Sequence, residues 1–454
     1  MVKFQFNLRR NKGISIEPTK IIVFSFIGVI FWGTLLLTLP ISSANPEKSA
    51  DFLTALFTAT SATCVTGFVV VDTLTGWSLF GQLVILSLVQ IGALGFVTFA
   101  TFFSIMLGKK VGLKTMILAQ ESINHFSFEG ILKLIKRLVL ITLLFELIGA
   151  LLLSISFVPK FGPRGFYLAV FHSISAFCNA GFDIFGDSQS LTGYNNDPLV
   201  LYTIAGLIII GGLGFVVWKD VWEFRKNKEL LLHTKVVLIT TAFLIISGAV
   251  LFFCFEYNNP GTMGGMNTFT KINTSFFQSV ITRTAGFNSI PLDKMREISK
   301  ITSVIFIFIG AAPGSTGGGI KVTTFGVILA VIISQIKGSS DTTIFKKRIP
   351  HYTVDKALAI IGLSLMLVIT ATTIILAADN KPFVDVLLEA ASAFSTAGMS
   401  SIGTSSLHTT SKIVLLITMF LGRVGPLTFA IALSLKNNKK TQDLIYPEGK
   451  IVVG

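Results

Sequence analysis

The 454-residue chain is 52% hydrophobic and only 13% charged, with a mean hydropathy of +0.75. Water-soluble domains carry about 25% charged residues, so this composition excludes a soluble globular protein. The net charge of +14 would suit a nucleic-acid partner. No module of interleaved basic and aromatic residues accompanies the charge, and we expect no nucleic-acid binding.

The first predicted membrane helix follows a basic N-terminal stretch, residues 1–19, which we expect in the cytoplasm. The apolar run after it lacks a small-residue cleavage site, which indicates a retained helix and not a signal peptide. Similar runs recur along the chain, each long enough to cross about 30 Å of hydrocarbon. These runs cover residues 21–39, 138–158, 236–255 and 358–378.

Charged residues between the apolar runs alternate in sign. Basic clusters occupy every second loop: Arg9, Arg10 and Lys12; Lys109, Lys110 and Lys114; Arg225, Lys226 and Lys228; Lys346, Lys347 and Arg348; Lys436, Lys439 and Lys440. The other loops are net acidic and hold Glu47, Asp51, Asp183, Asp187, Asp197, Asp293 and Asp379. Basic loops stay on the cytoplasmic side of a membrane. The alternation predicts a multi-pass protein of the cell membrane, with an even number of crossings and both termini in the cytoplasm.

Residues that could carry catalysis or bind a metal are scattered. Cys64, Cys178 and Cys254 form no CxxC pair, which argues against a disulfide framework or a zinc site. The five histidines are equally dispersed, and there is no HExxH motif, Ser/His/Asp grouping or carboxylate pair. We therefore expect neither enzyme activity nor a covalent cofactor.

Four short glycine-containing motifs recur at nearly equal intervals. They are TSATCVTGF, ISAFCNAGF, SVITRTAGF and ASAFSTAGM, with their glycines at Gly67, Gly181, Gly286 and Gly398. Each follows a segment too short to cross a membrane, and these segments cover residues 50–63, 165–177, 268–281 and 382–394. A long apolar run stands on either side. The repeated unit is therefore a helix, a re-entrant half-helix and a second helix.

Two crossings in each unit return the chain to its starting side, so successive units have the same orientation. Four such units can be related only by an axis along the membrane normal, around which they enclose a pore. Inverted repeats, the mark of many secondary transporters, need an odd number of crossings. We expect an all-α membrane protein with eight transmembrane helices and four re-entrant half-helices. The repeats cover residues 20–110, 131–226, 233–337 and 354–435, and a cytoplasmic tail follows at 436–454.

The four glycine loops are the predicted ion filter. Converging backbone carbonyls can replace the hydration shell of K⁺, and glycine leaves no side chain in a narrow lumen. The half-helices would also direct their partially negative C-terminal ends at the ion. The predicted potassium-binding residues are Val65, Thr66, Gly67, Asn179, Ala180, Gly181, Thr284, Ala285, Gly286, Thr396, Ala397 and Gly398. The alternative is that these glycines only let helices pack closely.

The stretch FIGAAPGSTGGGIK interrupts the second helix of the third repeat. Proline and glycine end a helix, and hydrocarbon cannot satisfy the freed backbone groups. We expect half-helices at 299–309 and 320–336, with water solvating the loop between them. The counterparts at 85–103, 200–218 and 413–434 are expected to run without a break. The predicted role is a movable gate made of Gly310, Ala311, Ala312, Pro313, Gly314, Ser315, Thr316, Gly317, Gly318, Gly319 and Arg423; the alternative is a passive kink.

Three cationic side chains lie in these membrane segments. Arg423 stands midway along the last apolar run, where a charge costs at least about 2.5–3.5 kcal/mol unless it meets water or a partner. We expect it to face the pore below the filter and repel cations or contact the gate; the alternative is a buried partner of Glu146 or of a backbone carbonyl. Arg283 is expected to brace the filter, with Asp183 or Glu389 as partners. Lys321 is either a gate contact or a side chain that reaches the interface.

The motifs TCVTGF, FCNAGF, TRTAGF and FSTAGM, together with GAAPGSTGGGIK and LGRVGPLTF, resemble the Trk/Ktr/HKT potassium transporter superfamily. Within it, the chain looks most like the membrane subunit of a bacterial Ktr system. The resemblance implies one filter glycine in each repeat, a gate at the glycine stretch, and a potassium preference from Gly67. It also implies a homodimer and a cytosolic RCK-domain ring that responds to ATP and ADP.

The expected function is potassium uptake through a channel-like pore, with the cytosolic ring controlling the gate. K⁺ is the transported ion, Na⁺ a candidate activator, and ATP or ADP would act only through the regulatory subunit. The rival hypotheses are a secondary transporter that couples cations to a solute and a Na⁺/K⁺ transporter. A solute transporter would need charged or aromatic side chains at mid-depth, and only Arg423 meets that condition.

Overall fold

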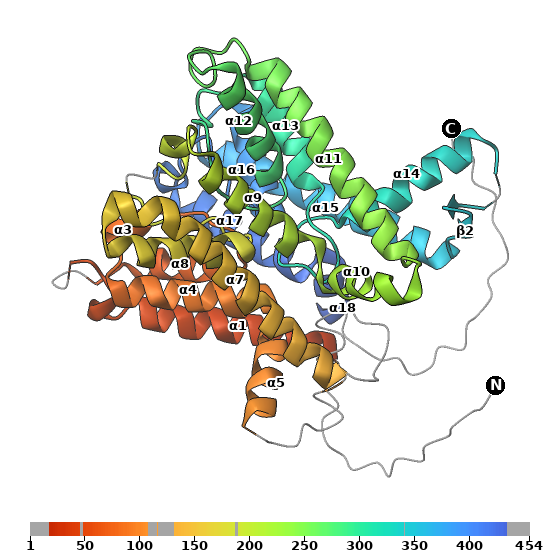
Figure 1. Ribbon diagram of the computed structural model, residues 1–454, viewed down its shortest axis with the longest axis horizontal. Helices are drawn as coiled ribbons and strands as arrows, with labels where there is room; N and C mark the ends of the chain where they lie inside the picture. The colour runs from red at the N-terminus through yellow and green to blue at the C-terminus, as the bar shows by residue number, and fades with distance from the viewer. Residues whose placement is uncertain are drawn as a thin grey trace.

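The computed structural model describes residues 18–45, 49–107, 116, 131–186, 189–339 and 341–433. Residues 1–17 of the predicted N-terminal stretch, the predicted tail, and the basic clusters near residues 10, 110 and 440 lie outside these residues. Figure 1 shows a bundle of helices, from which α14 extends towards a small hairpin.

The long predicted helices are present. They are α1 (Pro18–Leu37), α7 (Ile131–Phe161), α11 (Leu232–Glu256) and α15 (His351–Ala378). All four are long and apolar enough to cross a membrane. Two bent helix pairs raise the number of possible spans among the described residues to six. The protein is therefore a helical membrane protein, and the eight-crossing arrangement stays a prediction.

Four short helices stand where half-helices are predicted. They are α2 (Phe52–Thr63), α8 (Arg164–Phe177), α12 (Thr268–Ile281) and α16 (Phe383–Ser395). Two begin at side-chain caps: Asp51 accepts from the Leu53 amide, and Asn267 accepts from the Thr270 amide. Each packs against the long helix that precedes it in the chain, as α8 does against α7.

The second helices of the repeats correct the expectation of unbroken runs. They consist of α4 (Leu79–Leu94) with α5 (Phe96–Met106), α9 (Pro198–Leu213) with α10 (Phe215–Asn227), and α17 (Thr409–Val424) with α18 (Pro426–Leu433). The breaks fall at Gly95, Gly214 and Gly425, whose φ angles are +79°, +86° and +92°. Residues with a side chain rarely adopt such φ angles, whereas glycine adopts them at little cost. One glycine at each position therefore suffices to break the helix. The first two pairs bend by 97° and 93°.

The third repeat has the longest interruption, as predicted. Its halves are α13 (Glu297–Phe308) and α14 (Val322–Ile336), and residues 309–321 connect them. A short turn of α-helix, α3 (Thr73–Gly76), and three 3₁₀ turns, η1 (Pro40–Ser42), η2 (Thr192–Tyr194) and η3 (Thr404–Ser406), lie in connecting loops.

A two-stranded hairpin departs from the expected all-α class. Strands β1 (Thr343–Ile344) and β2 (Lys347–Arg348) pair antiparallel between α14 and α15. The two turn residues, Phe345 and Lys346, both have positive φ angles, which matches the right-handed twist of a two-residue hairpin.

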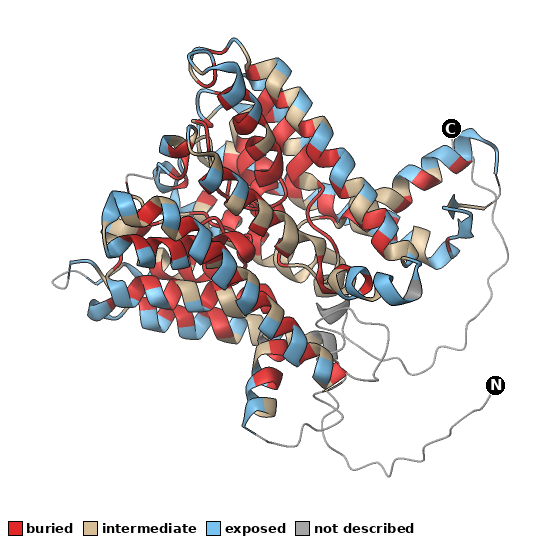
Figure 2. Cartoon of the chain, in the orientation of Figure 1, coloured by how far each residue is buried: buried red, intermediate tan, exposed pale blue. Residues whose placement is uncertain are grey.

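The burial pattern is that of a membrane protein with a polar interior. Outward-facing side chains are large and apolar; Trp32, Phe243 and Met366 are 67%, 60% and 67% exposed. The short helices instead bury hydroxyl side chains, among them Thr58, Thr60 and Ser392. Figure 2 shows exposed residues along the outer helices and buried residues where the short helices meet. Small polar groups therefore surround the centre, where the four glycine motifs lie.

Candidate ion-conduction site

The four glycine motifs share one backbone conformation. The glycines Gly67, Gly181, Gly286 and Gly398 have φ angles of +88°, +69°, +73° and +71°. The residues two positions before them, Val65, Asn179, Thr284 and Thr396, are also left-handed, with φ between +53° and +68°. Three of these four are β-branched, for which such a conformation costs about 1–3 kcal/mol. The surrounding structure must therefore hold each loop in its shape.

The four loops close into a ring. A methyl group added at Gly67 would lie 2.2 Å from the Ala180 carbonyl oxygen, and one at Gly181 would lie 2.5 Å from that of Ala285. A methyl group added at Gly286 would lie 3.1 Å from the Ala397 carbonyl oxygen, and one at Gly398 would lie 2.1 Å from the Thr66 carbonyl oxygen.

Each motif glycine thus lies against the carbonyl that precedes the glycine of the next motif, and the glycine of the fourth motif lies against the carbonyl in the first. Only a residue without a side chain fits at each contact. All twelve predicted filter residues lie in this ring or next to it, and they are buried.

A cavity of about 160 Å³ opens on one side of the ring. Its lining includes all four filter glycines, Asp72 and Asp183, together with hydroxyl groups of the loop that follows the fourth motif. Asp183 lies in a loop outside the spanning helices. Burial raises its pKa to about 7, and the charge of neighbouring Asp72 also raises it. The cavity therefore holds carboxyl groups that can attract a cation towards the ring.

The connecting segment of the third repeat packs directly against the ring. A methyl group at Gly317 would lie 2.2 Å from the Thr284 hydroxyl, and one at Gly318 would lie 2.3 Å from the Thr396 hydroxyl. Thr284 and Thr396 are the left-handed residues of the third and fourth motifs. The glycine loop, residues 310–319, therefore touches the ring of glycine motifs through glycines that leave no room for a side chain.

Protein groups hold the backbone of this loop, where the sequence led us to expect water. The Ala312 amide donates to Gly212 O at 3.0 Å, and the Thr316 amide donates to Gly211 O at 3.3 Å. In return, the Phe215 amide donates to Gly314 O at 3.1 Å. The glycine loop is therefore bonded to the bend between α9 and α10.

Three cationic side chains also hold the glycine loop; Arg283 is buried, and Lys321 and Arg423 are half-buried. Arg283 donates to the carbonyls of Ile309 and Gly310 at 3.1 and 2.6 Å. Lys321 donates to the Gly317 carbonyl at 2.7 Å and lies 3.4 Å from that of Gly318. Arg423 donates to the Thr316 carbonyl. No carboxylate within the described part of the chain forms a salt bridge with any of the three.

These contacts decide between the alternatives for the cations. The expected partners of Arg283, Asp183 and Glu389, are wrong, because its guanidinium bonds to carbonyls at the end of α13 instead. Glu146 is not the partner of Arg423; its carboxylate accepts from the side-chain amide of Gln90 at 3.0 Å. Arg423 also donates to the Gly92 carbonyl at 2.6 Å and so joins the glycine loop to α4. Lys321 contacts the glycine loop and does not reach out to the interface.

Sequence reasoning missed two groups of residues. Asn179 was expected to offer only its carbonyl, yet its side chain donates to Arg283 O at 3.0 Å and accepts from the Thr316 hydroxyl at 3.3 Å. Gly211 and Gly212 receive the glycine loop at the end of α9. The available signal for this second group was the similar sequence IGALG at residues 91–95 and IGGLG at residues 210–214, which recurs at the same place in the first two repeats.

Comparison with known proteins places the chain in a family. Residues 9–442 match the family model TrkH, described as a cation transport protein. The chain is 41% identical to Ktr system potassium uptake protein B of Bacillus subtilis over 444 residues, covering 98% of both chains. It is also 36% identical to the potassium/sodium uptake protein NtpJ of Enterococcus hirae, covering 97% of this chain and 98% of that one.

A solved structure supports the same fold. The potassium transporter TrkH of Vibrio parahaemolyticus superposes with a TM-score of 0.69 and 19% identity, covering 94% of this chain and 87% of the other. Together with the family model and the curated relatives, this shows that the chain belongs to the TrkH family of cation transport proteins.

Proposed function

We propose that this chain is the pore-forming subunit of a Ktr-type system and conducts potassium ions into the cell down their electrochemical gradient. The observation that carries the proposal is the closed ring of four glycine loops. Four sets of carbonyls around one axis can replace the water around K⁺. The curated relatives named as potassium uptake proteins support the same substrate.

A Na⁺/K⁺ transporter is the second candidate, because one relative is named a potassium/sodium uptake protein. A glycine at all four ring positions favours potassium, as the family resemblance implies for Gly67. Na⁺ would then act as an activator of the potassium pathway.

The glycine loop, residues 310–319, is proposed as the gate. It lies against the left-handed residues of two filter loops, and three cationic side chains hold its carbonyls. In this position, positive charge stands close to the route of a cation and raises the barrier to passage. Opening would require the tie that Arg423 makes between the glycine loop and α4 to break.

The proposal also includes a membrane topology and two kinds of partner subunit. Four parallel units with eight crossings place both termini in the cytoplasm. The word "system" in the names of the relatives supports a second component, which we propose to be an RCK-domain ring responding to ATP and ADP, bound to a homodimer of this chain.

The deciding experiment measures potassium and sodium flux into vesicles that contain the purified chain. Gly67→Ser should lower potassium-over-sodium selectivity, because the new side chain meets the Ala180 carbonyl oxygen. The matched control is Gly362→Ala, at a glycine with no atom within 4 Å of an added methyl group. If replacing each ring glycine in turn left the selectivity unchanged, the proposal that the ring forms the potassium pore would be refuted.

A further inference from the structure

Helix α10 carries an exposed face of mixed apolar and basic residues. Trp222 is 83% exposed, Val221 49% and Phe224 43%. Arg225 and Lys226, in the last turn, are exposed as well. A tryptophan beside cationic residues is typical of segments that lie at the boundary between lipid tails and headgroups.

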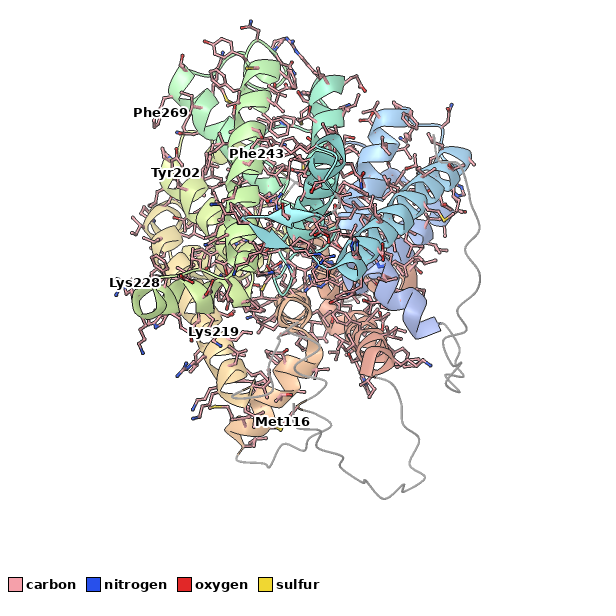
Figure 3. The ribbon with its side chains drawn as sticks, turned by 90° about the vertical axis from the view of Figure 1, so that its right-hand side faces the viewer. Met116, Tyr202, Lys219, Lys228, Phe243 and Phe269 are labelled. Atoms are coloured by element: carbon pink, nitrogen blue, oxygen red, sulfur yellow. The ribbon has the colours of Figure 1, made fainter. Side chains whose placement is uncertain are left out.

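The position of α10 fits this boundary. The helix turns by 93° from α9, so it runs across the direction of the spanning helices. In Figure 3, Lys219 of α10 and Lys228, the residue that follows the helix, lie at a lower level than Tyr202 and Phe243, whose side chains are exposed. The lysines at α10 therefore lie below the exposed aromatic side chains of α9 and α11 in this view.

The first half of α10 is packed and anchored. Phe215, Val217 and Asp220 are buried. The Asp220 carboxylate accepts from the Leu231 amide at 2.9 Å, which ties the helix to the start of α11. The exposed face is therefore presented by a helix with a defined orientation.

The first residue of α10 is bonded to the glycine loop. The Phe215 amide donates to Gly314 O at 3.1 Å, and a methyl group at Gly214 would lie 2.7 Å from Pro313 O. A change in the tilt of α10 must therefore shift Gly314 or break this bond.

We infer that the exposed face of α10 binds the anionic headgroups of the cytoplasmic leaflet, and that this contact holds the glycine loop in its present position. The second half of the inference rests on the proposed gate. A ligand stabilises the conformation to which it binds. Anionic lipid should therefore favour the arrangement in which α10 is bonded to the glycine loop, and lower the potassium flux.

The binding half can be tested without any transport. The full chain is placed in phosphatidylcholine vesicles with and without phosphatidylglycerol, and brominated phosphatidylcholine is used to quench tryptophan emission. Subtracting the Trp222→Phe variant isolates the signal of Trp222. We expect brominated lipid to quench this signal. Quenching by aqueous iodide alone would overturn the inference.

The regulatory half is tested by potassium flux in the same two kinds of vesicle. The parent should conduct several-fold more slowly with phosphatidylglycerol present, and Arg225→Gln/Lys226→Gln should abolish the difference. The control, Lys346→Gln/Lys347→Gln, removes the same charge from the hairpin and should keep the difference. A difference that survives in the α10 variant, disappears equally in both variants, or has the opposite sign would overturn this half. Loss of potassium flux in all vesicles would refute the proposed function while leaving the quenching result valid.

Discussion

The filter ring and the glycine loop are both glycine-rich backbone inside a membrane protein, yet they use their carbonyls in opposite ways. In the ring, each glycine lies against the carbonyl that precedes the glycine of the next repeat, and the contact recurs four times. In the glycine loop, cationic side chains bind carbonyls of Gly310, Thr316 and Gly317. Glycine content alone therefore does not distinguish the two segments. What distinguishes them is that cationic side chains bind the carbonyls of the glycine loop.

The largest effect should come from the ring. Gly398→Ala places a methyl group 2.1 Å from Thr66 O at a φ of +71°, so the loop must move. A left-handed alanine costs about 1–2 kcal/mol, and each 1.4 kcal/mol is a factor of ten. We expect potassium flux to fall at least about tenfold, measured in vesicles. Gly206→Ala, in the open middle of α9, is the control and should conduct normally. Normal flux in Gly398→Ala would show that the ring is not the conduction path.

The opposite sign is expected at Arg423. Arg423→Gln removes a charge that holds Thr316 O and Gly92 O. Hydrogen bonds to charged groups contribute about 1.5–3 kcal/mol, so flux without a regulatory subunit should rise about tenfold while selectivity persists. Size-exclusion chromatography of the same preparation tests the structural alternative. A well-folded variant with flux no higher than the parent would break the contrast between ring and gate.

Lys321→Met should act in the same direction but more weakly. Lys321 bonds within its own segment, to Gly317 and Gly318, whereas Arg423 joins the glycine loop to another helix. We expect a rise in flux of a few-fold, because the loop keeps its tie to α4. An increase larger than that of Arg423→Gln would mean that the local bond, and not the bond to α4, holds the gate.

The smallest effect concerns pH on the cavity side of the ring. Burial raises the pKa of Asp183 to about 7, so the carboxylate is ionised above neutrality and loses its charge as pH falls through that value. Acidifying that side from about pH 8 to about pH 6 should reduce flux at low potassium about two- to threefold. Asp183→Asn should conduct at the lower level and show no such step. A step that persists in this variant would place the titrating group elsewhere.

Much of the site was predictable from residue patterns. The short helices end close to their expected positions, because a polar segment between two long apolar runs has few other conformations. Gly67, Gly181, Gly286 and Gly398 could be aligned because four similar motifs recur. The breaks at Gly95 and Gly214 were missed, since a lone glycine in an apolar run is often tolerated inside a helix. The partners of Arg283 were missed for another reason. Backbone carbonyls have no sequence signature, and only carboxylates were considered for Arg283, whereas a backbone carbonyl was one of the alternatives for Arg423.

The contact between Gly398 and Thr66 has a consequence for biosynthesis. It joins the first filter loop to the last, which lie at opposite ends of the chain. A ribosome must therefore make nearly the whole protein before the ring can close. A chain that stops early lacks the fourth side of the ring, together with Arg423. The parts that we propose as filter and gate are thus completed in the same final stretch of synthesis.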